Sequence, residues 1–384
     1  MTSGGVTSGD MTLADGVPGQ IPDESTPGNR ITDIEGIAVG HHHRIDPTVT
    51  VGGADPGDVP GTGWATGTTV VRVDGPHPCA AVDVRGGGPG TRETDLLDPA
   101  NSVTTAHAIV LTGGSAYGLA AADGVMSELE RQGVGLVMDA HGHVVPIVPA
   151  AVIFDLPVGA WDHRPDAGFG AAALGAAAAD FAIGSVGGGA GARAGGLKGG
   201  VGTASRLISD GPAAGVRVGA VIVANPVGSV IDPCTGLPWG ATADDLQRLG
   251  LQAPNANELA AFRAVNEKAT VLNTTIGVVA TDAALGPSSL RRVAISAQDG
   301  LAQAIRPVHS PLDGDTIFAV TTGAIPVEPS APIPAGLNPD LALLAQVCAV
   351  ATEVTREAII SAVVSAQPVA DIPTYRRVLP SAMR

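Results

Sequence analysis

One threonine in the sequence has the surroundings of a nucleophile that activates itself. Asn273-Thr274-Thr275 opens an apolar segment that continues as IGVVAT. A threonine hydroxyl is a poor nucleophile unless a base takes its proton, and the neighbouring sequence supplies no histidine. Cleavage of the chain before Thr274 would create that base, because a free α-amine has a pKa of about 7.7 to 8.0. From the residues alone two interpretations stay open: a turn that leads into a buried strand, which this pattern typically forms, and an amino-terminal threonine nucleophile.

Two carboxylates precede another apolar segment, with a spacing that places them on one face. Asp313 and Asp315 flank Gly314 directly before TIFAVTT. Residues i and i+2 of a strand point the same way, so both side chains could hold an ammonium group or relay a proton at one site. The alternative is an Asp-Gly turn at the start of a strand. Calcium is not expected, because the other oxygen ligands of a calcium loop are absent.

The most glycine-rich stretch, residues 184–205, contains Lys198, and the chain has only one other lysine, Lys268. The stretch does not match a phosphate-binding loop, because Leu197 occupies the position of the required lysine. Three of its small residues mimic a dinucleotide-binding fingerprint, but no apolar helix follows them. We expect a loop that brings backbone and Lys198 close to another strand, with a plain flexible loop as the alternative.

Two further motifs offer donors for a developing oxyanion. The segment 113–117 lies between an expected strand and an expected helix, as the elbow of a serine esterase does, but Tyr117 stands where that pattern requires glycine. Ser115 as a helix N-cap is the alternative, and the backbone N–H groups of this turn could bind an anion. Asn225 directly precedes Pro226, so its side-chain amide could donate to an oxyanion, or it could simply end a strand with a turn.

Metal binding and disulfide formation are not expected. His41, His42 and His43 are consecutive, and consecutive strand residues point to opposite faces, so the three cannot bind one ion together. The three cysteines are far apart and form no C-x-x-C pair, which fits a reducing compartment. They are Cys79, Cys234 and Cys348.

Alternating strands and helices must position these motifs. Short apolar runs bounded by glycine and proline predict buried strands at 31–40, 68–73, 80–85, 106–112, 216–225, 275–281 and 316–322. Helices are expected at 115–132 and 288–305, and a third from an Asn338 N-cap to just before Pro368. The polar segment 241–268 is expected to be a linker or an exposed helix. Strands with so little polar alternation predict sheets covered on both faces, in an α/β or layered α+β architecture.

The composition indicates a globular protein, and its negative net charge disfavours anionic partners. Of the 384 residues, 45% are hydrophobic and 15% charged, which excludes a disordered chain. The net charge of −16 repels nucleic acid and anionic lipid, so neither is an expected partner. Residues 1–30 predict a flexible tail before a single domain at 31–384. No secretory signal and no long apolar span is apparent, so we expect a cytoplasmic location.

Six blocks place these motifs in a fixed order along the chain. They are GGGPGTRETDLLDP (86–99), LTGGSAYGLAAADGV (111–125), ARAGGLKGG (192–200), VIVANPVG (221–228), NTTIGVVATDA (273–283) and PLDGDTIFAVTTG (311–323). In this order, from about Ile31 to Tyr375, the chain resembles the self-processing peptidase family. That family contains the L-aminopeptidase/D-esterase, the β-peptidyl aminopeptidases and the nylon-oligomer endohydrolase.

The resemblance implies an α+β fold, an αββα sandwich of the N-terminal-nucleophile kind. It also implies cleavage between Asn273 and Thr274 into an α chain, 1–273, and a β chain, 274–384, assembled as tetramers of α/β pairs without metal or other cofactor. At the Thr and Asp-Gly-Asp positions the chain is similar to the nylon-oligomer branch.

Site roles also follow from the resemblance. Asn225 and the Tyr117 turn would form the oxyanion site, and Lys198 would lie beside the nucleophile. Asp313 and Asp315 would orient the amine and hydroxyl of the new amino-terminal residue.

The expected function is therefore an amide hydrolase that acts on amino-acid amides, short peptides or ω-amino-acid oligomers through an acyl-enzyme. Three alternatives stay open: an acyltransferase of similar fold, such as the ornithine acetyltransferases, a serine esterase that uses Ser115, and a nucleotide-binding protein without enzymatic activity.

Overall fold

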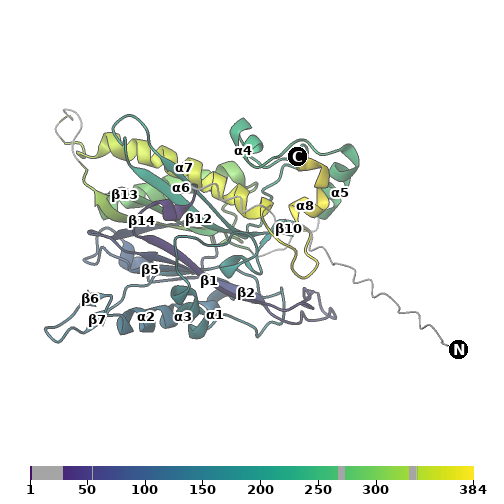
Figure 1. The fold of residues 1–384 in the computed structure, drawn as a ribbon, viewed down its shortest axis with the longest axis horizontal. Coiled ribbons are helices and arrows are strands. Elements are labelled where there is room, and N and C mark those ends of the chain that lie inside the picture. Colours follow the sequence, from purple (N-terminus) through teal and green to yellow (C-terminus); the bar gives the residue numbers. More distant parts are fainter. Residues whose placement is uncertain (2–28, 54, 267–272, 328–333, 335) are drawn as a thin grey trace.

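Two stacked β-sheets lie between two layers of helices (Figure 1). The computed structural model describes residues 1, 29–53, 55–266, 273–327, 334 and 336–384. Residues 2–28 of the predicted tail, and Lys268, lie outside these described residues. The expected αββα sandwich is confirmed.

The first sheet has the strand order β1-β2-β5-β8-β4. Its strands are β1 (Ile37–Ile45), β2 (Ala65–Val73), β5 (Ala108–Thr112), β8 (Ala150–Val152) and β4 (Thr91–Arg92). Helices α2 (Ala121–Arg131) and α3 (Ala167–Gly175) pack on its outer face, together with the short α1 (Ser115–Gly118). The β5–β8 pair is parallel and the other pairs are antiparallel.

The second sheet has the order β11-β12-β13-β14-β3. Its strands are β11 (Gly200–Leu207), β12 (Arg217–Ala224), β13 (Ile276–Ala283), β14 (Thr316–Ile325) and β3 (Cys79–Val84). Helices α6 (Pro287–Ala304) and α7 (Leu341–Val364) cover its outer face. Only the β13–β14 pair is parallel in this sheet, so those two strands begin at the same end.

Alternate residues of the second sheet enter two different cores. Val221, Val223 and Val278 pack between the sheets, against residues such as Ile109 of the first sheet. Their neighbours, such as Ile222, face α6 and α7. Both faces of these strands are therefore apolar, because successive strand residues point in opposite directions and each face has a covering layer.

Smaller elements connect the layers. The hairpins are β6 (Leu136–Val137) with β7 (Val144–Val145) and β9 (Arg193–Ala194) with β10 (Leu197–Lys198). Short helices are α4 (Ala243–Arg248), α5 (Ala256–Asn266) and α8 (Tyr375–Val378), with 3₁₀ turns η1 (Ile31–Asp33), η2 (Asp95–Leu97), η3 (Gly187–Gly189) and η4 (Pro380–Ala382). Within the described residues, no helix is both long and apolar enough to cross a membrane.

Most predicted elements are found, and four details differ. The strand expected at 31–40 begins only at Ile37, after a 3₁₀ turn, and Arg30, assigned to the tail, is already buried. The stretch 184–205 is not a single loop, because it contains the hairpin β9–β10 and most of β11. The helix expected at 115–132 is divided into α1 and α2. Helix α7 has Asp340 as its N-cap residue, two positions after the predicted Asn338.

Candidate active site

The site forms at the edge of the second sheet where β12 ends and β13 and β14 begin. Thr274 lies two residues before β13, and Asp315 lies directly before the parallel strand β14. Asn225 follows β12, which is antiparallel to β13, so its carboxyl end meets the same edge. Residues 41 positions or more apart in sequence are thereby brought together by strand direction alone.

The Thr274 hydroxyl is buried among backbone groups, and the residue is only 5% exposed. Thr274 Oγ1 donates to the carbonyl oxygen of Asn273 and accepts from Gly314 N at 3.1 Å. The Thr274 amide donates to the carbonyl oxygen of Asn225 at 2.6 Å. The hydroxyl is therefore held beside the carbonyl group of the bond that the sequence predicts to be cut.

Position 314 requires glycine because its backbone lies so close to the Thr274 hydroxyl. A Cβ atom there would lie 2.8 Å from Thr274 Oγ1 and 2.8 Å from the carbonyl oxygen of Gly88. Real Cβ atoms do not approach so closely, so any side chain would displace either the hydroxyl or the backbone of the neighbouring loop.

The two predicted carboxylates hold the backbone around Thr274. Asp315 Oδ1 accepts from Thr275 N at 2.8 Å, the residue next to the predicted nucleophile. Asp313 Oδ1 accepts from Val227 N at 3.0 Å, and its Oδ2 accepts from the Ser310 hydroxyl at 2.6 Å. Burial raises the pKa of Asp313 above its usual value, and the nearby Asp315 charge acts in the same direction.

Asn225 connects the site to two other segments. Its side-chain Oδ1 accepts from Arg193 N in β9 at 2.7 Å. Its Nδ2 donates to the carbonyl oxygen of Phe154 at 3.4 Å, a long and weak bond. The amide that was predicted to serve an oxyanion is therefore buried beside Thr274 with only a weak acceptor.

Lys198 is completely buried in β10, next to Arg193 in the hairpin. Its Nζ donates to the carbonyl oxygens of Gly189 at 2.8 Å and Gly199 at 2.9 Å. Burial lowers the pKa of Lys198 to about 7, the Asp155 carboxylate opposes that change, and Arg193 adds to it. An ammonium group with this pKa is easily switched between charged and neutral forms near neutral pH.

Tyr117 lies in α1 and is 57% exposed. The guanidinium of Arg164 lies 3.9 Å from the centre of its ring, in a cation–π contact. Ser115 is not the N-cap that was one interpretation of this motif, because Gly114 takes that position with a left-handed φ of 83°. Ser115 itself has a φ of 52°, so the turn is tightly bent at both residues.

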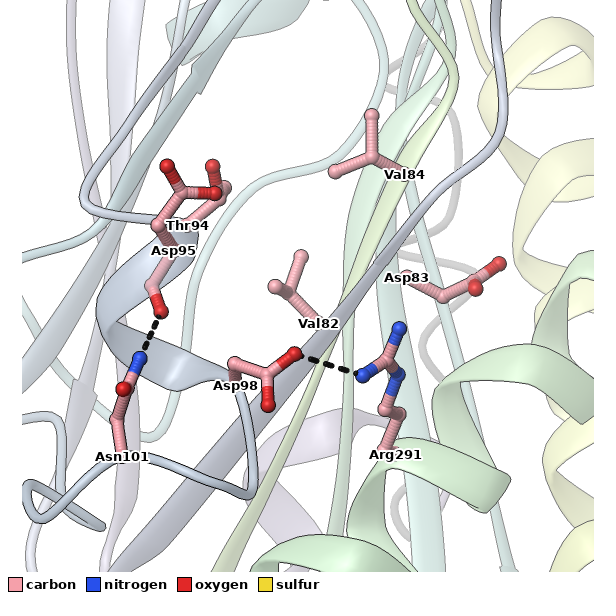
Figure 2. A pocket seen from close by; sticks show the side chains of 8 residues that line it. All are labelled: Val82, Asp83, Val84, Thr94, Asp95, Asp98, Asn101 and Arg291. Atoms are coloured by element: carbon pink, nitrogen blue, oxygen red, sulfur yellow. Dashed lines mark hydrogen bonds and ion pairs between the residues drawn. The ribbon is translucent and has the colours of Figure 1, made fainter.

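One groove opens at the edge of the sandwich near this site. It has a volume of about 390 Å³, and Figure 2 shows its lining of two valines, polar residues and the Asp98–Arg291 ion pair. Val84 is paired with Thr316, which is paired with Ile276 of β13. At about 4.8 Å between adjacent strands, the groove begins about 10 Å from the start of β13, which Thr274 precedes by two residues.

Among the residues that the structure describes, no three or more His, Cys, Asp or Glu side chains are grouped so that they could hold an ion together. His41 is instead bonded to Thr69 Oγ1 at 2.9 Å and to the carbonyl oxygen of Ala182 at 3.0 Å. His43 Nδ1 accepts from Gly187 N at 3.3 Å.

The sequence profile of peptidase family S58 matches residues 29–375. The chain belongs to this family. An uncharacterized aminopeptidase of Mycobacterium tuberculosis is 54% identical over 358 residues, which cover 92% of this chain and 99% of that protein. The 6-aminohexanoate-oligomer endohydrolase of Kocuria sp. is 33% identical over 287 residues, 73% of this chain and 74% of that enzyme.

Solved structures agree with this S58 assignment. A β-aminopeptidase of Burkholderia sp. superimposes with a TM-score of 0.62 at 25% identity, over 93% of this chain and 94% of that one. The L-aminopeptidase D-Ala-esterase/amidase of Ochrobactrum anthropi, a variant of the Ntn-hydrolase fold, gives 0.60 at 21% identity, over 88% and 86%. The chain is thus a peptide or amide hydrolase with an Ntn-type fold.

Two residues of this S58 site were not found from the sequence. His309 Nδ1 bonds Asp315 Oδ2 at 2.8 Å, and its backbone has a left-handed φ of 52°. Asp155 is buried beside Gly114 and acts on Lys198 through space. Neither residue stands in a recognisable motif, and both contacts depend on segments that only the folded sheets bring together.

Proposed function

We propose that this S58 hydrolase is activated by cleavage between Asn273 and Thr274, and that Thr274 then serves as an amino-terminal nucleophile. The observation that carries the proposal is the position of Thr274 Oγ1, which contacts both the Asn273 carbonyl oxygen and Gly314 N. In the first step the Thr274 oxygen attacks the Asn273 carbonyl carbon. The peptide C–N bond breaks, its nitrogen takes the hydroxyl proton, and an ester joins the two residues. Water then opens the ester and restores the hydroxyl.

The freed α-amine becomes the base of the second reaction. Its nitrogen lies 2.6 Å from the Asn225 carbonyl oxygen, so one N–H can stay bonded there while the lone pair accepts the hydroxyl proton. Thr274 attacks the carbonyl of an external amide, the amine product leaves with that proton, and water hydrolyses the acyl-enzyme.

The surrounding residues have distinct roles in this proposal. Asp315 fixes the strand start through Thr275 N, and Asp313 fixes the loop whose Gly314 meets the hydroxyl. The Asn225 amide has only a weak bond at 3.4 Å, so an oxyanion can replace that acceptor with little loss. Tyr117 completes the oxyanion site, and the Lys198 charge stabilises the developing negative charge from the adjacent hairpin.

The substrates we propose are amino-acid amides, short peptides and linear ω-amino-acid oligomers. Relatives named as an aminopeptidase and as an oligomer endohydrolase support this range. We further propose that processed α/β pairs assemble into a homo-oligomer, which the mass in solution would test.

A denaturing gel tests the proposal directly. Cleavage before Thr274 yields fragments of about 27 and 11 kDa from a chain of 37.9 kDa, and the smaller one begins Thr-Thr-Ile-Gly. Thr274→Ala should give one uncut band without activity against a panel of amides and linear oligomers. Ser115→Ala serves as control, and should still be cut and active. Turnover that survives Thr274→Ala but not Ser115→Ala would instead establish a serine esterase.

A further inference from the structure

Asp155 is a buried carboxylate that the reaction proposed above does not use. It follows β8 and Phe154, and it is only 2% exposed. Asp155 Oδ1 accepts from Gly114 N at 2.6 Å, and Oδ2 accepts from Thr66 Oγ1 at 2.7 Å. One side chain therefore joins strand β2, the segment after β8 and the tight turn before Tyr117.

The neighbouring glycines leave room for this carboxylate. A Cβ atom on Gly113 would lie 2.2 Å from Asp155 Oδ2, and one on Gly191 would lie 2.8 Å from the same oxygen. Both positions belong to segments that the sequence marks as motifs, the turn before Tyr117 and the glycine-rich stretch that carries Lys198. Together with Thr66 of β2, these two segments surround the carboxylate, and neither can accept a side chain where it touches Asp155.

Asp155 is also the acidic group that acts on Lys198. Burial raises the pKa of Asp155 to about 6, while bonds from Thr66 and Gly114 and the Lys198 charge oppose that rise. In the reverse direction the Asp155 carboxylate favours the ammonium form of Lys198, whereas Arg193 from the adjacent strand β9 disfavours it. The two buried charges therefore support each other.

The backbone of Phe154, the residue before Asp155, contacts Asn225. The Phe154 carbonyl oxygen accepts the weak bond from Asn225 Nδ2. Movement of Asp155 would therefore displace the acceptor of Asn225 together with the turn that carries Tyr117.

We propose that Asp155 is a positioning residue of this hydrolase, which holds the Tyr117 turn and the Asn225 acceptor in place and sets a carboxylate against the glycine-rich stretch that carries Lys198. The inference rests on the proposed function, because it assigns these three residues to the reaction of Thr274. Asp155 itself touches neither the nucleophile nor, in this proposal, the substrate.

Asp155→Asn removes the negative charge of this side chain and keeps its shape. The asparagine can still accept from Gly114 N and contact Thr66 Oγ1, so the turn should keep its geometry. Removal of the negative charge favours neutral Lys198. We expect kcat/KM for an amino-acid amide to fall on the order of 10- to 100-fold. The alkaline limb of its pH profile should move to lower pH, which a purely structural role would not cause.

Asp166→Asn is a matched control. Asp166 is exposed and caps α3 by accepting from Phe169 N at 3.1 Å, and asparagine caps a helix equally well. This variant should keep the wild-type rate and pH profile. Wild-type rate and an unmoved alkaline limb in Asp155→Asn would overturn the inference.

A second variant keeps the test valid if Asp155→Asn does not fold. Thr66→Val removes one bond to the carboxylate and keeps its charge, so the turn before Tyr117 should be held less firmly. We expect a lower kcat/KM with an unmoved alkaline limb. A wild-type kcat/KM in folded Thr66→Val would also contradict the inference. Loss of the proposed function is recognised separately, because Thr274→Ala would then remain active whatever Asp155→Asn does.

Discussion

At the scale of single residues, the role proposed for Lys198 comes at a cost in folding stability. Its ammonium group is fully buried, and its two bonds at 2.8 and 2.9 Å go to neutral carbonyl oxygens. Desolvation of a charge costs more than such bonds return, so burial lowers the pKa from 10.5 to about 7. A lysine needed only for packing would be replaced by an apolar residue at lower cost.

This pKa predicts a particular dependence of stability on pH. Between about pH 7 and 10.5 the unfolded chain binds a proton at Lys198 that the folded chain does not. The free energy of unfolding should therefore rise with pH by up to about 1.4 kcal/mol per unit from this group, and level off below pH 7. Lys198→Met removes the contribution. Denaturant unfolding of both proteins at pH 8, 9 and 10 measures it as a widening difference in favour of wild type at higher pH.

A difference that is the same at pH 8 and pH 10 would show that Lys198 has an ordinary pKa in the folded protein. Activity provides the second readout, because Lys198→Met should fold and yet hydrolyse amides poorly. Stability that is retained while activity is lost is expected of a residue held in an unfavourable environment for chemistry.

At the scale of elements, the packing of strand β11 requires two glycines, Gly200 and Gly202. The same glycines make the strand hard to recognise from the sequence. A Cβ on Gly202 would lie 2.0 Å from the Ala358 carbonyl oxygen of α7, and one on Gly200 would lie 2.6 Å from the Gly184 carbonyl oxygen. Helix α7 therefore packs directly on the backbone of the strand. Gly202→Val should destabilise the protein by about 1 to 3 kcal/mol or more, since neither backbone can move easily. Thermal unfolding measures the loss.

Gly175→Ala is the matched control for that substitution. Gly175 ends α3, and nothing lies within 4 Å of where its Cβ would be. Alanine there should be neutral or stabilising by up to about 1 kcal/mol, because glycine is the weaker helix former. A Gly202 variant as stable as Gly175→Ala would mean that α7 does not require close approach to β11.

The same glycines explain which elements could be predicted. Strands such as β12 and β13 are apolar on both faces and flanked by turn residues, so their composition alone identifies them. Strand β11 begins Gly-Val-Gly-Thr, and its pairing depends on β12 and α7, which local sequence does not contain. Between α1 and α2 the backbone bonds are of the i→i+3 kind, from Leu119 N to the Ala116 carbonyl oxygen and from Ala120 N to the Tyr117 carbonyl oxygen.

The candidate site divides in the same way. Thr274, Asn225 and the Asp313–Asp315 pair end or begin apolar strands, so the sequence could mark each as a candidate, whereas their position at one edge follows from the strand pairing. Asp155 and His309 could not be predicted, because each acts only through a partner from a distant segment. The expected N-cap Asn338 was wrong for a similar reason, since Asp340 is fixed by Ser289 Oγ of α6 at 2.6 Å.

At the scale of the whole molecule, the proposed cut would divide the chain without dividing the fold. The segment after Asn273 contributes β13 and β14 to the middle of the second sheet, together with α6 and α7. Strand β12 pairs with β13 on one side, and β3 pairs with β14 on the other. Both of these flanking strands, β12 and β3, precede the proposed cut. The core between the sheets likewise mixes residues from both parts, such as Ile109 and Val278.

We therefore expect the two fragments to stay together after cleavage. Separation would expose both edges of a central strand pair and the apolar faces on either side of it, which water cannot compensate. Native size-exclusion chromatography of the processed protein should give one species that contains the fragments of about 27 and 11 kDa in equal amounts. Denaturant should separate them in the same transition that unfolds the sheets. The uncut Thr274→Ala chain should elute at the same position, and a processed sample whose smaller fragment elutes alone without denaturant would show that the sheet does not hold the two parts together.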